Sequence, residues 1–545
     1  MITFLKKYWL LILAIIIASF LRFYKLDTVP ALNADEAAIG YNAYSLIQTG
    51  KDEHGNTWPI HFQSFNDYKP GLYFYAIIPF IKFFGLNEWA VRVPGALIGV
   101  LTVLVIYFLS KELFKNEKIA GISALFLAIS PWHIHFSRGG WEVNLATFLI
   151  TLGVLTFLKV AKNPSIKNLA LSIIPFALSL YAYHAARIIA PILGIGLIAI
   201  YRKELLTKKN LKALTVCVLF LIVLLFPLVS DLAKGGVLSR AAGVGLFADQ
   251  GPINRINEQR GEHANVGIIS ARFLHNKLVN YGLAFLGNWA AHYHGLFLFV
   301  SGDDIERDKV PETGQMYMLD ILFVLVGLYF LARSKQDKGK AFVYFWLLAA
   351  PLAAALTFQA PHALRSQNMV IPLILVSSLG FHGIISWLNQ KKMRLGTILL
   401  LLVVVLGFAR YQHMYWVHMA KEYPFSSQYG IKELTQYLSQ NKDNYQKIYV
   451  SDKYDQPYIL FLFYMKYSPE NFQGNHSLTP RDKFGFSTVR DFDKFHFESL
   501  DFARVLQDNS GVLVAAAPDE VPEGAEVKER IYGSNGHEYF DIITR

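Results

Sequence analysis

Long apolar runs alternate with short polar connections over residues 1–410. Each run is about 17 to 25 residues long, which is the length of α-helix that crosses a hydrocarbon core about 30 Å thick. By this criterion we count about eleven runs. The pattern therefore predicts an α-helical polytopic membrane protein.

The pattern changes after Arg410, where the apolar runs become short and turn signals separate them. One stretch has helical spacing, at residues 431–441. Three stretches read as strands, at residues 447–452, 511–517 and 538–544. We therefore predict two domains: a transmembrane domain over residues 1–410 and a small soluble α/β domain over residues 411–545.

Positive charge alternates between the connections. Lysine and arginine concentrate in every second one, at residues 1–7, 110–118, 159–168, 201–212, 332–340 and 389–394. Cytoplasmic loops are enriched in these residues, so we expect a cytoplasmic N-terminus and an extracytoplasmic C-terminal domain in the cell membrane. The net charge of +11 is mostly this topology signal and gives no reason to expect a nucleic-acid partner.

Composition excludes other classes of protein. Apolar residues make up 53% of the chain, which is too large a share for a soluble enzyme. The single cysteine, Cys217, lies inside an apolar run and rules out an intrachain disulfide or a thiolate metal cluster. No small-x-small cleavage site follows the first apolar run, so we expect it to be retained as a helix.

The first outer loop begins with a predicted surface helix over residues 33–48. Asn33 is placed to cap it and Glu36 stands at the third position of a capping box. Apolar residues repeat on one face, which we expect to meet lipid or the transmembrane bundle: Ile39, Ala43, Leu46 and Ile47. Asp35 and Glu36 fall in the first turn, either as helix caps or as parts of a site.

A second feature of this loop is the apolar stretch at residues 72–85, which is short for a span. If it crossed the bilayer, the charge alternation downstream would invert, so we expect an interfacial or re-entrant segment. Lys69 and Pro70 stand at its entrance, and Arg92 and Pro94 begin the next span. One loop thus brings a carboxylate pair and fixed cations to the same membrane depth.

The order of these features resembles a known family. An Asp-Glu pair in a juxtamembrane helix, Lys69-Pro70 before a short apolar segment, and the stretch RVPGALIGVLTVLVIYFLSKELF are similar to GT-C glycosyltransferases of the protein O-mannosyltransferase and aminoarabinose transferase superfamily, in particular its bacterial and archaeal family 39-like members. The resemblance covers residues 1 to about 187 and follows topology alone as far as residue 410. Gly71 stands where the family often has a second proline.

The resemblance implies an inverting transfer of a hexosyl or pentosyl group from a polyprenyl-phosphate donor to a hydroxyl on the outer face. Asp35 would be the base, and Glu36 would orient it, bind the acceptor or hold the helix. Lys69 would stabilise the departing phosphate, with Arg138 and Arg365 as further candidates. Both arginines would otherwise be interfacial anchors or ion-pair partners.

Other residues at the outer ends of the spans are candidates for binding substrate. Tyr181, Tyr183 and His184 would line a sugar pocket, together with Arg92, or the tyrosines would form an interfacial belt. The implied partners are the lipid-linked donor, a protein, lipid or glycan acceptor, and membrane lipids.

No cofactor is predicted. In the long loop over residues 231–314, His292 and His294 are two positions apart, and Glu262 and His263 lie in the same loop. Imidazole and carboxylate bind divalent metals, but the spacing matches no recognised metal motif.

Two alternative functions remain. A transporter would also have many spans, although it usually carries an internal repeat and polar groups at the membrane midplane, and we find no convincing repeat. An oligosaccharide transferase, polymerase or ligase would share the architecture. The C-terminal domain has no Gly-rich phosphate loop and no catalytic motif, which favours a scaffold or acceptor-docking role.

Overall fold

The computed structural model describes residues 2–65, 67–161, 164–234, 243–264, 269–481, 487–505 and 511–545. Parts of the predicted connection at residues 159–168 and of the predicted loop at residues 231–314 lie outside the described residues.

The chain folds into two compact units. One, here called the helical unit, contains residues 1–21, 98–136 and 142–411. The other, the mixed unit, contains residues 22–97, 137–141 and 412–545. The mixed unit combines residues 22–97, which include the predicted first outer loop, with residues 412–545, here called the C-terminal segment. No local pattern in the sequence indicates this association. The predicted boundary between residues 410 and 411 stays a prediction.

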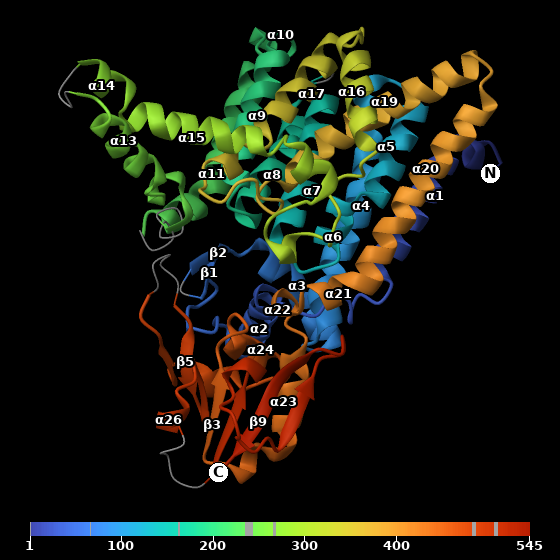
Figure 1. Ribbon diagram of the computed structural model, residues 1–545. Coiled ribbons are helices and arrows are strands. Elements are labelled where there is room, and N and C mark those ends of the chain that lie inside the picture. The colour runs from blue at the N-terminus through green and yellow to red at the C-terminus, as the bar shows by residue number, and fades with distance from the viewer. Residues whose placement is uncertain are drawn as a thin grey trace. The chain divides into compact units, whose positions relative to one another are not determined.

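The helical unit is built from α-helices (Figure 1). Those wholly inside it are α5 (Glu117–Ile129), α7 (Glu142–Val160), α8 (Ile166–Ala182), α9 (Ala186–Ile200), α10 (Arg202–Leu205), α11 (Leu211–Leu232), α13 (Gly251–Gly261), α14 (Ile269–Leu274), α15 (Lys277–Ala291), α16 (Asp320–Ala332), α17 (Asp337–Ala349), α18 (Leu352–Ala355) and α19 (Val370–Gln390). Four helices begin in one unit and end in the other: α1 (Ile2–Phe23), α4 (Glu88–Phe114), α6 (Pro131–Ser137) and α20 (Arg394–His413).

Small residues let α16 and α19 approach closely. A Cβ atom at Gly327 would lie 2.0 Å from the carbonyl oxygen of Val376, and one at Gly380 would lie 1.9 Å from that of Phe323. Side chains at these two positions would push the helices apart, which is why helix contacts in membranes are rich in glycine.

By length and composition, the described part of the chain holds five helices that are able to cross a membrane, or six if α5 and α6, bent by 57°, form one span. The five are Glu88–Phe114, Glu142–Val160, Lys208–Leu232, Gln367–Gln390 and Arg394–Glu422. Four further apolar helices are shorter. The multi-pass helical architecture is therefore confirmed, whereas the count of about eleven spans stays a prediction.

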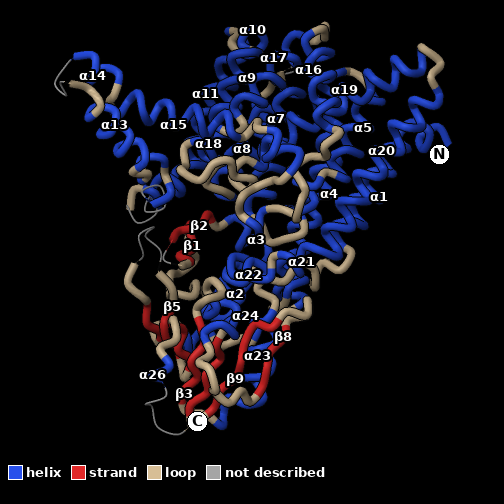
Figure 2. Tube along the Cα trace, viewed as in Figure 1, coloured by secondary structure: helices blue, strands red, loops and turns tan. Residues whose placement is uncertain are grey.

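The mixed unit contains a seven-stranded sheet with the order β4-β5-β6-β3-β7-β9-β8 (Figure 2). Its strands are β3 (Lys447–Ser451), β4 (His476–Leu478), β5 (Val489–Phe492), β6 (Phe495–Glu498), β7 (Val512–Ala516), β8 (Glu529–Tyr532) and β9 (Glu538–Thr544). β3 runs parallel to both of its neighbours, and the other pairs are antiparallel. All five residues of β7 are buried, as expected for a continuously apolar strand in the middle of a sheet.

Helices accompany this sheet in the C-terminal segment. They are α21 (Met419–Glu422), α22 (Pro424–Ser427), α23 (Gly430–Asn441), α24 (Pro457–Tyr464), α25 (Pro469–Phe472) and α26 (Phe502–Val505). The predicted helix at residues 431–441 and the three predicted strands are confirmed as α23, β3, β7 and β9. The C-terminal segment is thus an α/β structure, as the pattern predicted.

The outer loop contributes two helices and one hairpin to the same unit: α2 (Ala34–Thr49), α3 (Leu72–Phe84), and the pair β1 (His61–Ser64) and β2 (Asp67–Pro70). α2 packs against α3 and against α24 of the C-terminal segment. A Cβ at Gly40 would lie 2.6 Å from the Phe463 ring, so the two helices are in close contact there. The buried face of α2, which we expected to meet lipid or the transmembrane bundle, therefore packs on these elements.

Candidate active site

α2 has the capping box that its sequence predicted. The Asn33 side chain accepts a hydrogen bond from the Glu36 amide (3.0 Å), and the Glu36 carboxylate accepts one from the Asn33 amide (3.3 Å). The helix spans Ala34–Thr49 and ends at Gly50, whose φ of 71° is the left-handed conformation that glycine adopts without strain. The predicted helix at residues 33–48 is thus confirmed to within one residue at each end.

Glu36 is locked in place by charged and polar partners. Its carboxylate accepts hydrogen bonds from Arg92 Nε and Nη2, both at 2.7 Å, and from the Gly140 amide at 2.8 Å. Both charged side chains are fully buried. A Cβ at Gly140 would lie 2.9 Å from Val91 and 3.4 Å from Glu36 Cγ, so this position needs glycine if its amide is to reach the carboxylate.

Arg92 uses the rest of its guanidinium on the backbone that leads into α2. It donates to the carbonyls of Leu26, Pro30 and Ala31 at 2.7 to 3.0 Å. Its donors are therefore directed at Glu36 and at the chain before the helix. Through these contacts Arg92 holds the backbone before α2 against Glu36. Its predicted role in substrate binding stays a prediction.

Asp35, the neighbouring carboxylate, has a different environment. Its side chain is 22% exposed, compared with 1% for Glu36. It forms an ion pair with Lys69, whose ammonium donates a hydrogen bond to Asp35 Oδ1. The structure thus brings together the two residues that the sequence analysis named as base and phosphate ligand.

The hairpin of β1 and β2 positions Lys69. Lys69 pairs with Phe62 across the two strands, and its ammonium lies 4.9 Å from the centre of the Phe65 ring. The Gly71 amide donates to the Ile60 carbonyl (2.9 Å), and a Cβ at Gly71 would lie 2.7 Å from that oxygen. A proline would lack this N–H and would clash, which explains why Gly71 stands here in place of the second proline.

A group of buried titratable residues in the same loop was not indicated by any motif. Glu53 is fully buried, and neither carboxylate oxygen has a hydrogen-bond partner among the described residues. Burial raises its pKa to about 8, with the Asp52 charge adding to the effect and the Lys69 charge opposing it. His54 Nε2 lies 3.6 Å from Glu53 Oε1, and burial lowers the pKa of His54 to about 4.

Arg138 is also buried in the mixed unit. Its Nε donates to the Tyr415 hydroxyl (2.9 Å) and its Nη2 to the Val29 carbonyl (2.9 Å). The guanidinium carbon lies 4.7 Å from the centre of the Trp416 ring and 5.3 Å from that of Tyr415. Arg138 therefore joins the chain before α2 to the start of the C-terminal segment, and its predicted phosphate role stays a prediction.

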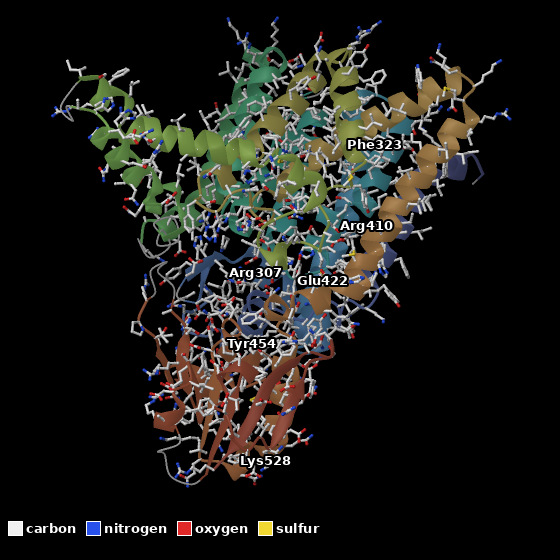
Figure 3. The ribbon with its side chains drawn as sticks, in the orientation of Figure 1. Arg307, Phe323, Arg410, Glu422, Tyr454 and Lys528 are labelled. Atoms are coloured by element: carbon white, nitrogen blue, oxygen red, sulfur yellow. The ribbon has the colours of Figure 1, made fainter. Side chains whose placement is uncertain are left out.

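Two glutamines of the C-terminal segment hold α2. Gln428 Oε1 accepts from the Ala34 amide (2.9 Å), while its amide nitrogen donates to the Asp455 carbonyl (2.6 Å), next to Tyr454, which Figure 3 labels. Gln473 donates to Ser45 and Thr49 near the other end of the helix, each at 3.0 Å. Both ends of the helix that carries Asp35 are thus tied to the C-terminal segment.

The remaining predicted residues lie in the helical unit. Tyr181 donates to the Leu224 carbonyl (2.6 Å) and accepts from the Leu228 amide (3.2 Å), so it ties α8 to α11. Tyr183 ends α8, and the rings of Tyr183 and His184 are 6.4 Å apart. Arg187 Nη1 lies 3.1 Å from His184 Nδ1.

Arg365 is half-buried in the loop before α19. It donates to Thr357 Oγ1 (2.8 Å) and to Gln359 Oε1 (3.3 Å). Both of these hydrogen-bond partners of the guanidinium are neutral side chains.

The histidines named in the sequence analysis form no metal cluster among the described residues. His292 is hydrogen-bonded to the Asn288 carbonyl (2.8 Å) and accepts from the His362 amide (3.2 Å), while His263 lies against the His275 ring. The group within reach of one ion is a different one, Asp303, Asp308 and His362. The sequence analysis predicted no metal at these histidines, and that stays a prediction.

An apolar cavity of about 700 Å³ lies inside the helical unit. Residues of α5, α16 and α20 line it, among them Phe323 and Arg410, which are labelled in Figure 3. Arg410 forms an ion pair with Glu312 (2.9 Å). Most of its lining side chains are apolar, and Glu312, Asp320 and Arg410 also line it.

Part of the chain is similar to a known family, and its fold is similar to that of solved structures. Residues 68–229 match the family model described as dolichyl-phosphate-mannose-protein mannosyltransferase. The structure is similar to that of ArnT from Cupriavidus metallidurans bound to undecaprenyl phosphate, with a TM-score of 0.55 and 12% identity over 98% of each chain. Residues 68–229 are thus similar to the protein mannosyltransferases, and the fold of the chain is similar to that of ArnT. The resemblance seen in the sequence is thereby confirmed.

Two other similarities are weaker. The oligosaccharyltransferase AglB from Archaeoglobus fulgidus, in complex with an inhibitory peptide and a dolichol-phosphate, has a TM-score of 0.48 and 14% identity over 84% of this chain and 64% of its own. An uncharacterized protein of Aquifex aeolicus (strain VF5) is 26% identical over 150 residues, which are 28% of this chain. The chain spans 29% of the length of that relative.

The family match includes Lys69, Arg92 and Arg138, whereas Asp35 and Glu36 lie before its first residue. Two ion pairs, Lys69–Asp35 and Arg92–Glu36, connect residues inside the family match with residues before it.

Proposed function

We propose that this GT-C protein transfers a sugar from a polyprenyl-phosphate donor to a hydroxyl acceptor, with inversion at the anomeric carbon. The observation that carries the proposal is the ion pair between Lys69 and Asp35 at the first turn of a capped helix. Undecaprenyl phosphate in the ArnT structure supports a lipid-phosphate donor of this class.

Asp35 acts as the base in this proposal. The acceptor oxygen forms a bond to the anomeric carbon while the bond from that carbon to the phosphate oxygen breaks, and the hydroxyl proton passes to the Asp35 carboxylate. A carboxylate is a weak base towards an alcohol, so its benefit comes from positioning and from taking the proton late in bond formation. The partial exposure of Asp35 suits this role because an acceptor must reach it.

Lys69 receives the negative charge that leaves with the lipid phosphate. A fixed ammonium stabilises this charge more in the transition state than in the ground state. In the structure the ammonium bonds to Asp35. We propose that the donor phosphate takes over this ammonium when it binds, which releases Asp35 to accept the proton from the acceptor.

Glu36, Arg92 and Gly140 hold the reacting carboxylate in place. A buried bidentate ion pair is geometrically rigid, so it fixes the first turn of α2 and with it the depth of Asp35. Of the roles that the resemblance left open for Glu36, we therefore propose the one of holding the helix.

Other parts of the proposal rest on less specific features. Tyr181, Tyr183, His184 and Arg365 remain proposed contacts for the sugar or the phosphate. The apolar cavity of the helical unit is suited to an isoprenoid tail because its lining is apolar. The acceptor is proposed as a protein, a lipid or a cell-envelope glycan on the outer face.

A panel of polyprenyl-phosphate sugars tests the proposal. The purified full chain is incubated in liposomes with each donor and a cell-envelope fraction, and free polyprenyl phosphate and glycosylated product are measured by mass spectrometry. We expect both products with at least one donor, in equal amounts. Release of intact donor on the far side of the liposome, with no bond broken, would instead identify a transporter.

A further inference from the structure

Three side chains of metal-ligating type converge in two loops of the helical unit, and none of them belongs to the proposed active site. Asp303 lies before the short helical turn Glu306–Asp308, Asp308 is the last residue of that turn, and His362 lies in the loop between α18 and α19. All three side chains are at most 5% exposed. Their ligand atoms lie within 4.8 Å of one another.

The distances between these atoms fit a metal ion better than direct hydrogen bonds. His362 Nδ1 lies 3.4 Å from Asp308 Oδ2 and 3.6 Å from Asp303 Oδ2. A hydrogen bond from imidazole to a carboxylate is about 2.7 to 3.2 Å long. Two ligands on a tetrahedral ion with bonds of about 2.1 Å are about 3.4 Å apart. The imidazole nitrogen is therefore spaced from each carboxylate as two ligands of one cation are.

The charge of the cluster leads to the same conclusion. Two carboxylates are buried beside one imidazole, and burying ionised carboxylates costs free energy unless a cation compensates them.

We propose that Asp303, Asp308 and His362 bind one divalent cation, and that Zn²⁺ is the ion that suits them. Imidazole together with carboxylates is a ligand set of zinc, which takes three protein ligands and a water in its open sites. Asp308 also lines a cavity of about 10 Å³, enough for one water molecule, together with His135 and Thr313.

Backbone contacts around the cluster resemble the outer shell of a metal site. The Ala363 and Ile305 amides donate to the two oxygens of Asp303, and the His362 amide donates to His292. Such contacts orient ligands before the metal arrives. A bound ion would join the loop at residues 303–308 to the loop that carries Arg365, three residues after His362.

Metal binding is tested on the full chain in detergent after chelator treatment. We expect isothermal titration and elemental analysis to find one equivalent of Zn²⁺, and the thermal midpoint to rise when Zn²⁺ is restored. Replacement by Co²⁺ should give the visible absorption of a tetrahedral site in the wild-type protein, a readout that needs no variant.

Matched variants separate this site from other metal-binding groups. Asp308→Asn and His362→Ala should each weaken Zn²⁺ binding by at least about 10-fold. The controls Asp304→Asn and His294→Ala, both exposed neighbours, should bind as the wild type does. The proposal is overturned if the wild type binds no stoichiometric Zn²⁺, or if the cluster variants and the controls bind equally.

Discussion

Arg92 and Glu36 form a bidentate ion pair in which both hydrogen bonds are 2.7 Å long and both side chains are fully buried. The two residues are 56 positions apart in the chain. Three backbone carbonyls and the Gly140 amide satisfy further donors and acceptors of the pair. This pair fixes the first turn of α2, where Asp35 lies.

Removing one partner of this pair should destabilise the protein strongly. Glu36→Gln leaves the Arg92 charge buried without its carboxylate, a change that costs about 3 to 5 kcal/mol in other proteins. We expect a large fall in the thermal midpoint of the purified chain. The matched control is Asp519→Asn, which removes an exposed partner of Lys453 and should cost less than about 1 kcal/mol. Equal midpoints for the two variants would contradict the assigned role of Glu36.

Lys69 is predicted to act on the donor rather than on folding. Lys69→Ala should lower kcat/KM for the lipid-linked donor by about 10²-fold, because a charged group that stabilises the leaving phosphate is lost. Lys69→Arg keeps a cation and should retain part of the activity. Lys51→Ala, at an exposed lysine of the same loop, is the control. Unchanged donor kinetics in Lys69→Ala would remove this residue from the phosphate site.

The buried Glu53 should make stability depend on pH. Its pKa rises from the ordinary 4.5 to about 8 in the folded state, so between these values the unfolded chain has released a proton that the folded chain still holds. Raising the pH within this range therefore favours unfolding, by at most about 1.4 kcal/mol per pH unit.

We expect the wild type to lose stability between about pH 6.5 and about pH 8, and Glu53→Gln to lose this dependence. The window avoids His54, whose pKa burial lowers to about 4. Thermal midpoints across the window provide the measurement, and Glu523→Gln, at an exposed carboxylate, should behave as the wild type does. The same slope in Glu53→Gln and in the wild type would show that this carboxyl is not the cause.

Gln428 should couple the C-terminal segment to α2. Gln428→Ala removes the acceptor of the Ala34 amide and leaves a buried N–H without it, at a cost of about 1 to 3 kcal/mol. We expect faster hydrogen exchange at the first turn of α2, measured by mass spectrometry. Gln440→Ala on the exposed face of α23 is the control. Unchanged exchange in Gln428→Ala would mean that this contact does not hold the helix.

Local patterns in the sequence predicted the elements but not their long-range partners. The capping box of α2 could be predicted because Asn33 and Glu36 are three residues apart and the cap depends on that spacing alone. The helix α23 and the strands β3, β7 and β9 were predictable for the same reason, since their apolar periodicity is local.

Contacts between distant residues had no such signal. Nothing near Gln428 indicates that its side chain caps the Ala34 amide, which lies 394 positions away. Asp303 and Asp308 match no metal spacing until the fold brings His362 beside them. In the sequence, Glu53 looks like an ordinary acidic residue of a loop. Its burial depends on how the loop packs in the mixed unit, and no local pattern indicates that packing. Such features follow from tertiary packing, which a single sequence does not reveal.

The most direct test of the central proposal is the transfer rate of Asp35→Asn, measured with a polyprenyl-phosphate sugar that the wild type uses. We predict a loss of at least about 10²-fold in kcat, because the asparagine keeps the shape but cannot accept the proton. The thermal midpoint should stay close to that of the wild type, and the donor should bind no more weakly, because its phosphate no longer competes with the Asp35 carboxylate for Lys69. Asp27→Asn, at an exposed acid before the same helix, should keep full activity. Wild-type turnover in Asp35→Asn would contradict the assignment of Asp35 as the base.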